Sequence, residues 1–186
     1  LVHYGTWISS CIAYVTSVNP ADFGSCGNQY WSGGPANGWN GVTLDPNGVW
    51  SDTAAEPTLN TAGVNSRYAL ILGAVEPSTH FIIDTSRNGR GPWAPSADQS
   101  FPDPQTWCNP PGRGIGIRPT ANTGNALVDA YVWIKVPGES DGQCSRGLGT
   151  GDNVLDPIWG QVDPDAGVWF PEQALELANL ANPPLQ

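Results

Sequence analysis

The chain has 186 residues and a formal net charge of −10 at pH 7, and only 13% of its residues are charged. A pI near 4.2 excludes functions that depend on attraction to nucleic acid or to an anionic membrane, because both are themselves negatively charged. No apolar run approaches the roughly 20 residues that a membrane-spanning helix needs. The 39% hydrophobic content and nine tryptophans exclude a disordered chain and indicate one domain with a real core.

The four cysteines form no Cys-x-x-Cys pair, which fits two disulfide bonds better than a zinc site. Disulfides persist in oxidising compartments, so we expect a secreted, extracellular protein. The chain contains no methionine and begins at Leu1, and we therefore expect residues upstream of it.

Helical spacing of apolar residues predicts a first helix over residues 1–17. Residues 20–60 show little periodicity but contain three tryptophans, which favours an ordered loop. Cys11 and Cys26 are close enough in sequence to join the start of this loop to the helix. The predicted buried stripe of the helix is Leu1, Tyr4, Ile8, Cys11, Ile12 and Val15, and the loop tryptophans are Trp31, Trp39 and Trp50.

A second helix is predicted over residues 62–72, with Gly73 as its stop. Residues 80–84 then have the pattern of a short buried strand, which ends in a charged tip containing Asp84 and Arg87. The buried face of this second helix is predicted to consist of Val64, Tyr68, Ile71 and Leu72.

A second buried strand is predicted over the apolar run 130–134. After a Pro-Gly break, Glu139 and Asp141 follow on a tight loop. Lys135, where strand becomes loop, is the only lysine of the sequence. This chain therefore does not use lysines to solvate its surface, and we interpret this lysine with its two carboxylates as a site. The alternative is a surface turn with an incidental ion pair, which contributes little stability.

A third helix is predicted to begin at Pro171 and Glu172, since proline and an acidic residue both suit a helix N-terminus. Alternation of helix, strand, helix, strand and helix indicates an α/β fold around a parallel sheet. The charged tips of the two strands are then expected to face the same side of the sheet.

The chemistry expected at this edge centres on one carboxylate. Arg87 and Lys135 would flank Asp141 and keep it ionised by charge pairing. A carboxylate kept charged can act as a base or stabilise a developing cation. Trp107, in a loop, offers a flat apolar face for a sugar ring, whereas Trp133, inside the predicted strand, is expected to pack in the core.

The acidic loop before the last helix raises the question of a calcium site. The spacing of its aspartates lacks the EF-hand pattern, so we expect no metal. We find no Ser/His/Asp set and no phosphate loop, and we expect no cofactor. The aspartates of this loop are Asp152, Asp156, Asp163 and Asp165.

Five stretches of the chain, in order and spacing, resemble glycoside hydrolase family 6, the inverting cellulases. They agree with the C-terminal half of the family's catalytic domain, and residues 1–186 are expected to be that portion. The matching stretches are 81–89 (FIIDTSRNG), 107–112 (WCNPPG), 118–124 (RPTANTG), 128–142 (VDAYVWIKVPGESDG) and 169–177 (WFPEQALEL).

The resemblance implies the C-terminal part of a distorted (β/α) TIM-like barrel, with long irregular loops that form a cellulose-binding cleft or tunnel. Asp141 corresponds to the carboxylate proposed as catalytic base. Arg87 would pair with Asp141, and Asp84 would support its strand tip. The glucosyl-binding residues correspond to Trp107, Lys135 and Glu139.

The resemblance also implies a disulfide between Cys108 and Cys144 near the active site, which leaves Cys11 and Cys26 for a loop disulfide. Expected partners are cellulose or cello-oligosaccharides, bound by a secreted monomer; no nucleic acid and no membrane partner is expected.

One part of the family's machinery has no counterpart in these residues. The family's general acid lies in an Arg-Asp-Cys motif that does not occur here, and inverting hydrolysis needs an acid and a base about 6.5–9.5 Å apart. We therefore expect a part of a β-1,4-glucanase that, alone, hydrolyses cellulose poorly. The alternatives are a non-catalytic cello-oligosaccharide-binding domain derived from a hydrolase and a secreted structural or interaction domain without sugar affinity.

Overall fold

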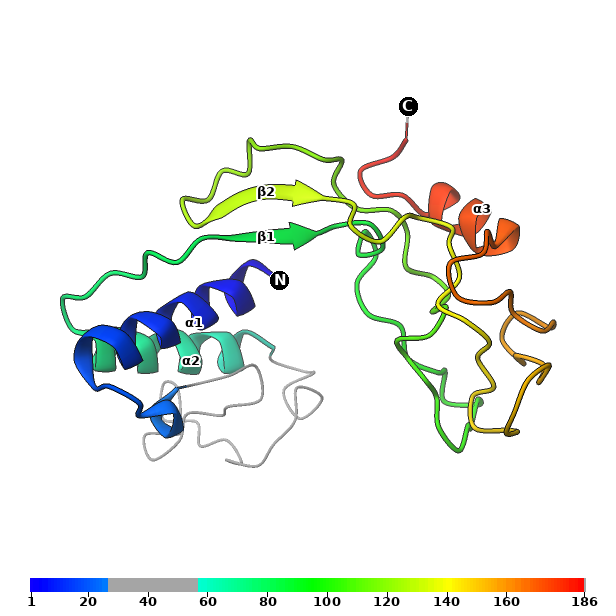
Figure 1. Ribbon diagram of the computed structural model, residues 1–186, viewed down its shortest axis with the longest axis horizontal. Coiled ribbons are helices and arrows are strands. Elements are labelled where there is room, and N and C mark those ends of the chain that lie inside the picture. Colours follow the sequence, from blue (N-terminus) through cyan, green and yellow to red (C-terminus); the bar gives the residue numbers. More distant parts are fainter. Residues whose placement is uncertain (27–56, 186) are drawn as a thin grey trace. The chain divides into compact units, whose positions relative to one another are not determined.

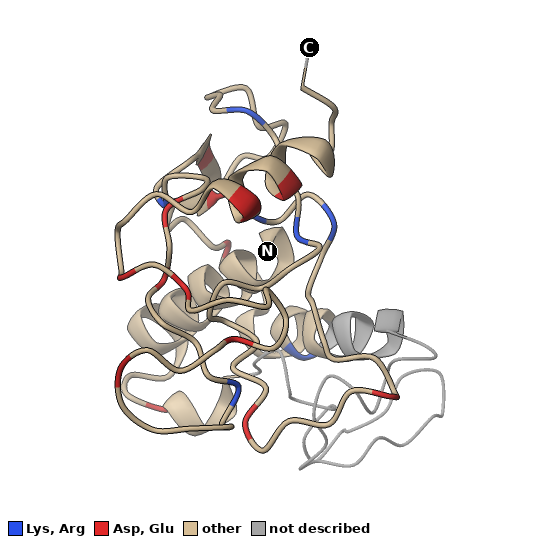
Figure 2. Cartoon of the chain, turned by 90° about the vertical axis from the view of Figure 1, so that its right-hand side faces the viewer, with Lys and Arg blue, Asp and Glu red and all other residues tan. Residues whose placement is uncertain are grey.

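The computed structural model describes residues 1–26 and 57–185, so the three loop tryptophans lie outside the described residues. Two compact units share the chain: Leu1–Ile83 with Thr123–Asp129, and Asp84–Asn122 with Ala130–Gln186. Within the described part, no helix has both the length and the apolar character that a membrane crossing requires. Acidic residues (red) outnumber basic ones (blue) along the chain (Figure 2).

The first unit is built on two helices, α1 (Val2–Ala13) and α2 (Pro57–Leu72), which pack side by side (Figure 1). The chain continues from α1 into a π-helical turn, Tyr14–Val18, and then a short 3-10 turn, Phe23–Ser25. Both predicted helices are confirmed, although α2 begins five residues earlier than predicted. It ends where Gly73 adopts a φ of +59°, which glycine reaches without steric cost.

The buried face of α1 differs from the predicted one. Trp7 of α1 and Tyr14, the first residue of the π-helical turn, pack in the core with three side chains of α2. Both faces have helical spacing, and the one that carries the two large aromatic rings packs against α2. Of that stripe, Cys11 and Val15 pack against the core. The prediction is wrong for Leu1, Tyr4, Ile8 and Ile12, which are exposed, and correct for the α2 core residues Val64, Tyr68 and Leu72.

The two strands pair as predicted. β1 (Phe81–Asp84) and β2 (Val128–Val132) form a two-stranded sheet. The N–H of Phe81 donates to the carbonyl of Leu127 and the N–H of Thr85 to that of Val132, which is a parallel pairing (Figure 1). The fold is therefore α/β. The predicted alternation of helix and strand is wrong, because residues 85–127 contain no helix; their many prolines and glycines favour turns over helix.

The position and burial of β2 also differ from the prediction. The strand begins two residues before the predicted 130–134 and ends at Val132. It is only partly buried, and Ile134 beyond it is 63% exposed. Trp133 packs as expected, against a small core of the second unit that consists of Ile115, Leu177 and Ala181.

The second unit consists mainly of loops around one helix, α3 (Pro171–Asn179), which starts with the predicted proline. Both expected disulfides form. In the first unit, Cys11–Cys26 joins α1 to the end of the 3-10 turn. In the second unit, Cys108–Cys144 joins the loop of Trp107 to the loop of Asp141. The loops that carry the predicted site are therefore covalently connected.

Candidate active site

Asp141 lies at the centre of a charged cluster in the second unit. Its carboxylate accepts hydrogen bonds from Arg87 Nη1 at 2.6 Å, from Arg87 Nη2 at 3.2 Å and from the backbone N–H of Asn109 at 2.8 Å. The Lys135 Nζ atom is 3.6 Å from Asp141 Oδ1, and the Asp141 side chain is only 14% exposed. Two cations therefore stabilise one mostly buried negative charge, in the arrangement expected from the sequence.

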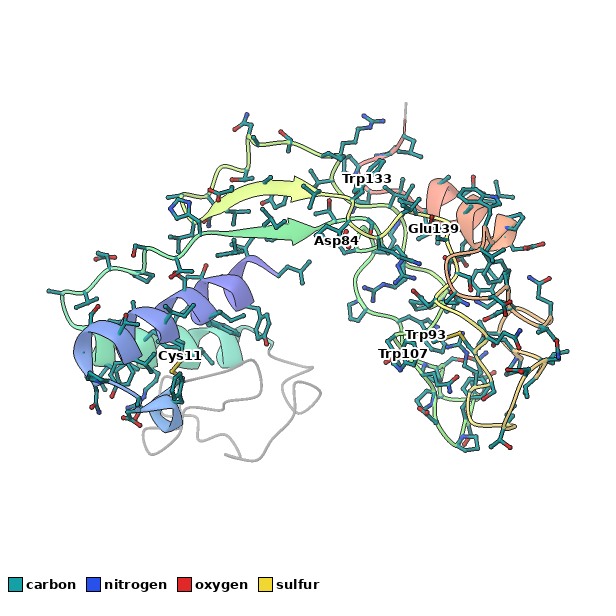
Figure 3. The ribbon with its side chains drawn as sticks, in the orientation of Figure 1. Cys11, Asp84, Trp93, Trp107, Trp133 and Glu139 are labelled. Atoms are coloured by element: carbon teal, nitrogen blue, oxygen red, sulfur yellow. A yellow bond between two sulfur atoms is a disulfide. The ribbon has the colours of Figure 1, made fainter. Side chains whose placement is uncertain are left out.

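Asp84 connects the ends of the two strands. Its Oδ2 atom accepts a hydrogen bond from the backbone N–H of Lys135 at 3.1 Å, and its Oδ1 atom accepts one from that of Ser86 at 2.9 Å. Burial alone would raise the pKa of Asp84, but these hydrogen bonds outweigh burial and lower it. The charged carboxylate therefore holds the chain where β2 ends (Figure 3). From this position Lys135 Nζ donates to the carbonyl of Ser140 at 3.1 Å.

The remaining predicted site residues are Trp107 and Glu139. The Trp107 indole and the Glu139 carboxylate are both accessible to a ligand. Trp107 is 67% exposed and lies with Trp93 in the loop region of the second unit (Figure 3). Glu139 is partly exposed, and its backbone pairs with Trp169. Its carboxylate makes no hydrogen bond or ion pair with another described residue. The indole and this carboxylate are therefore free to contact a ligand.

A second ion pair, which sequence reasoning missed, supports the Trp107 loop. Arg146 and Asp156 are fully buried, and their side chains meet through two hydrogen bonds of 3.1 and 2.6 Å. Arg146 Nη1 also donates to the carbonyls of Gln105 at 2.9 Å and Cys108 at 2.8 Å. Arg146 lies in a Gly- and Ser-containing loop with no periodic pattern. The sequence therefore offers no signal that this arginine is buried.

The four aspartates considered for calcium do not converge, since Asp152 and Asp165 are exposed whereas Asp156 and Asp163 are buried. The two buried carboxylates approach Cys144, with ligand-type atoms within 4.8 Å of one another. Cys144 is disulfide-bonded and offers no thiolate, and Asp156 is already paired with Arg146. This set is poorly suited to a metal ion.

Asp163 is an acid held in an unusual environment. It is 1% exposed, and its Oδ2 atom accepts a hydrogen bond from Asn109 Nδ2 at 2.8 Å. Its Oδ1 atom is buried without a hydrogen-bond partner in the described part of the chain. Burial, reinforced by the negative charge of Asp156, raises the pKa of Asp163 to about 6, against the lowering effect of Asn109. Below that pH the protonated Asp163 can donate to Asp156.

We expect the free energy of unfolding to fall as the pH rises from 4 to 7.5, and we expect Asp163→Asn to reduce this loss. Between pH 3.8 and about 6, folded Asp163 holds a proton that the unfolded side chain, with its ordinary pKa of 3.8, has released. The folded state thus binds more protons, so its stability falls as pH rises through about 6. The asparagine can donate to Asp156 at every pH. Urea unfolding at several pH values should show roughly 1–3 kcal/mol less pH-dependent loss in the variant.

Asp152→Asn is the matched control for this pH experiment, because it removes an exposed carboxylate. Its unfolding curve should follow that of the wild type at every pH. Equal pH slopes for the wild type and Asp163→Asn would show that Asp163 has no raised pKa.

Comparison with known proteins identifies a sequence family. The protein-family model "Glycosyl hydrolases family 6" matches residues 26–181. A "Probable 1,4-beta-D-glucan cellobiohydrolase C" of Aspergillus terreus is 34% identical over 89% of this chain and 40% of its own length. A "1,4-beta-D-glucan cellobiohydrolase CEL6A" of Pyricularia oryzae is 37% identical over 80% of this chain and 29% of its own length. The chain thus spans less than half of these curated relatives.

Two solved structures are also similar to this chain in sequence. The endoglucanase Cel6 from Mycobacterium tuberculosis, in complex with a methyl-cellobiosyl-thio-cellobioside, is 40% identical over 63% of this chain and 31% of its own, with a TM-score of 0.40. The cellobiohydrolase II (Cel6A) from Humicola insolens, in complex with glucose and cellotetraose, is 35% identical over 70% of this chain and 35% of its own, with a TM-score of 0.43.

Proposed function

Since the chain belongs to family 6 of the glycosyl hydrolases, we propose that it supplies the base side of an active site that hydrolyses β-1,4-glucosidic bonds of cellulose with inversion. The observation that carries this proposal is the Asp141 carboxylate, held by Arg87 at 2.6 Å and by Lys135 at 3.6 Å on a loop beside an exposed tryptophan. We further propose that the chain is part of a distorted (β/α) barrel in a secreted monomer.

The proposed reaction uses Asp141 as the base. As the oxygen of a water molecule forms a bond to the anomeric carbon, Asp141 takes up one proton of that water. The bond between the anomeric carbon and the leaving oxygen breaks on the opposite face, and a carboxylic acid outside this cluster protonates that oxygen. Attack from the opposite face inverts the configuration. Arg87 and Lys135 contact the Asp141 carboxylate and orient it, and Asp84 holds the backbone of Lys135 in position.

The proposed substrate follows from the exposed groups around this carboxylate. The Trp107 ring can stack on the apolar face of a glucosyl unit, while Glu139 and Lys135 accept and donate hydrogen bonds at its hydroxyls. Cellulose and cello-oligosaccharides are neutral and rich in hydroxyl groups. Such ligands suit a chain with a net charge of −10, which would repel anionic polysaccharides.

The experiment that tests this function follows the anomeric configuration of the product. The natural protein that carries this chain is incubated with cellohexaose, and the first products are observed by proton NMR. We expect the α-anomer to appear first, because inversion converts a β-glucosidic bond into an α-hemiacetal. Initial release of the β-anomer would contradict inversion. Binding of cellohexaose without any hydrolysis would instead support a non-catalytic cello-oligosaccharide-binding domain.

Trp107→Ala should weaken the binding of cellohexaose about 30-fold, which corresponds to about 2 kcal/mol for loss of an aromatic anchor. The indole is already 67% exposed, so its removal should leave the melting temperature nearly unchanged. Titration calorimetry measures the affinity. Phe23→Ala is the matched control, since Phe23 is an aromatic residue with 66% exposure outside the site. Equal affinities of Trp107→Ala and wild type would remove Trp107 from the binding site.

A further inference from the structure

Asn109 is hydrogen-bonded to Asp141 and makes several further hydrogen bonds through its side chain. It is fully buried, and its backbone φ is +38°. A non-glycine residue adopts this left-handed conformation at a cost, and asparagine is among the few that tolerate it. Asn109 follows Cys108, which is disulfide-bonded to Cys144. The backbone strain at this position is thus held by covalent and hydrogen-bonded neighbours.

Asn109 holds Asp141 from two sides. The backbone N–H of Asn109 donates to Asp141 Oδ2 at 2.8 Å, and the backbone N–H of Asp141 donates to Asn109 Oδ1 at 2.7 Å. The first bond fixes the carboxylate, and the second fixes the main chain that carries it. The same Oδ2 atom accepts the 2.6 Å hydrogen bond from Arg87. Asn109 therefore determines where the carboxylate meets the arginine.

The orientation of the Asn109 amide is determined by its other partners. Its Nδ2 atom donates to Asp163 Oδ2 at 2.8 Å and to the carbonyl of Gly142 at 2.9 Å, and lies 3.1 Å from Ser140 Oγ. Because an amide nitrogen only donates, these acceptors turn the carbonyl end of Asn109 toward the Asp141 N–H. A rotated amide would place its oxygen against the oxygens of Asp163 and Gly142.

We infer that Asn109 is a positioning residue for Asp141, and that Asp163 fixes the orientation of the Asn109 amide. This inference rests on the proposed function for its effect on rate, and on the hydrogen bonds alone for its effect on the Asp141 loop. Asn109 is fully buried, so we expect its effect to reach the reaction only through Asp141.

Asn109→Gly is the sharpest test of this inference. Glycine accepts a φ of +38° and keeps the backbone N–H that donates to Asp141, so only the amide is lost. With cellohexaose and the natural protein, kcat should fall roughly 10- to 100-fold, since small misplacements of reacting groups have effects of this size. KM should stay within about threefold, because the exposed groups around Trp107 are unchanged. A higher KM at an unchanged kcat would overturn the inference.

Hydrogen–deuterium exchange supplies a readout that does not depend on activity. In the wild type the Asp141 N–H is bonded to Asn109, whereas the neighbouring Ser140 N–H donates to the carbonyl of Val168 at 2.8 Å. In Asn109→Gly, exchange should accelerate at least about tenfold at Asp141 and stay unchanged at Ser140. Unchanged exchange at Asp141 would overturn the inference. If the wild type shows no hydrolysis, the proposed function fails, while this measurement still decides the positioning.

Two further variants control for simple destabilisation. Asn153→Gly makes the same substitution at an exposed left-handed position with a φ of +61° and should leave kcat unchanged. Asn109→Asp keeps the acceptor for the Asp141 N–H but loses the donor to Asp163, and should also lower kcat. Adding Asp163→Asn to Asn109→Asp restores a donor between the two side chains, so kcat should recover severalfold. No recovery in the double variant would remove Asp163 from the inference.

Discussion

Asp141→Asn is expected to lower kcat for cellohexaose hydrolysis at least about 100-fold in the natural protein, the scale of a lost general base. The amide has the same shape and keeps an oxygen that can accept from Arg87 and from the backbone of Asn109, which now contact Asp141 at 2.6 and 2.8 Å. It carries no charge and takes up no proton from water. The rate should therefore fall while the fold persists.

Binding separates this chemical effect from a structural one. Since the proposed sugar contacts come from other side chains, calorimetry should give Asp141→Asn an affinity for cellohexaose within about threefold of the wild type. Asp152→Asn, which removes an exposed carboxylate of the same loop region, should retain full activity. A kcat for Asp141→Asn within threefold of the wild type would exclude Asp141 as the base.

Arg146→Met is expected to produce the largest loss of stability, about 3–5 kcal/mol, because it leaves the fully buried Asp156 charge without a partner. It also removes the donors to the carbonyls of Gln105 and Cys108 on the Trp107 loop. Urea unfolding of the natural protein measures the free energy. Arg118→Met, at an exposed arginine, should change it by less than about 0.5 kcal/mol.

The double variant Arg146→Met/Asp156→Asn distinguishes the ion pair from general packing. Because both charges are gone, it should be more stable than Arg146→Met alone. If Arg146→Met alone lowered the free energy of unfolding by less than about 1 kcal/mol, the buried pair would contribute little to the stability of the fold.

The sequence predicted the charged edge of the sheet because its signals are local. Apolar runs that end in charged residues placed Asp84 and Arg87 behind one strand and Lys135 and Asp141 behind another, and parallel strands bring such ends together. The helix that begins at Pro171 was readable for the same reason, since a proline and an acidic residue at a helix start act within one turn.

The face that α1 buries was not readable from its own sequence. Two apolar stripes fit helical spacing, one through Tyr4 and Ile8 and one through Trp7 and Tyr14, and only packing against α2 selects the second. The Gly- and Pro-rich segment between the strands contains no helix, so helices and strands do not alternate as predicted.

The sequence by itself thus determined the α/β class, the family and the carboxylate with its two flanking cations, because each follows from short local motifs. Arg87 and Asp141 are 54 positions apart, but each follows a predicted strand, and parallel strands bring such ends together. Only the tertiary structure decided which groups hold that carboxylate. Asn109 reaches Asp141 and Asp163 across 32 and 54 positions, and Arg146 reaches the carbonyl of Cys108 across 38. Hydrogen bonds between such distant groups leave no periodic trace in the sequence, because their energy depends on where the folded backbone places donor and acceptor.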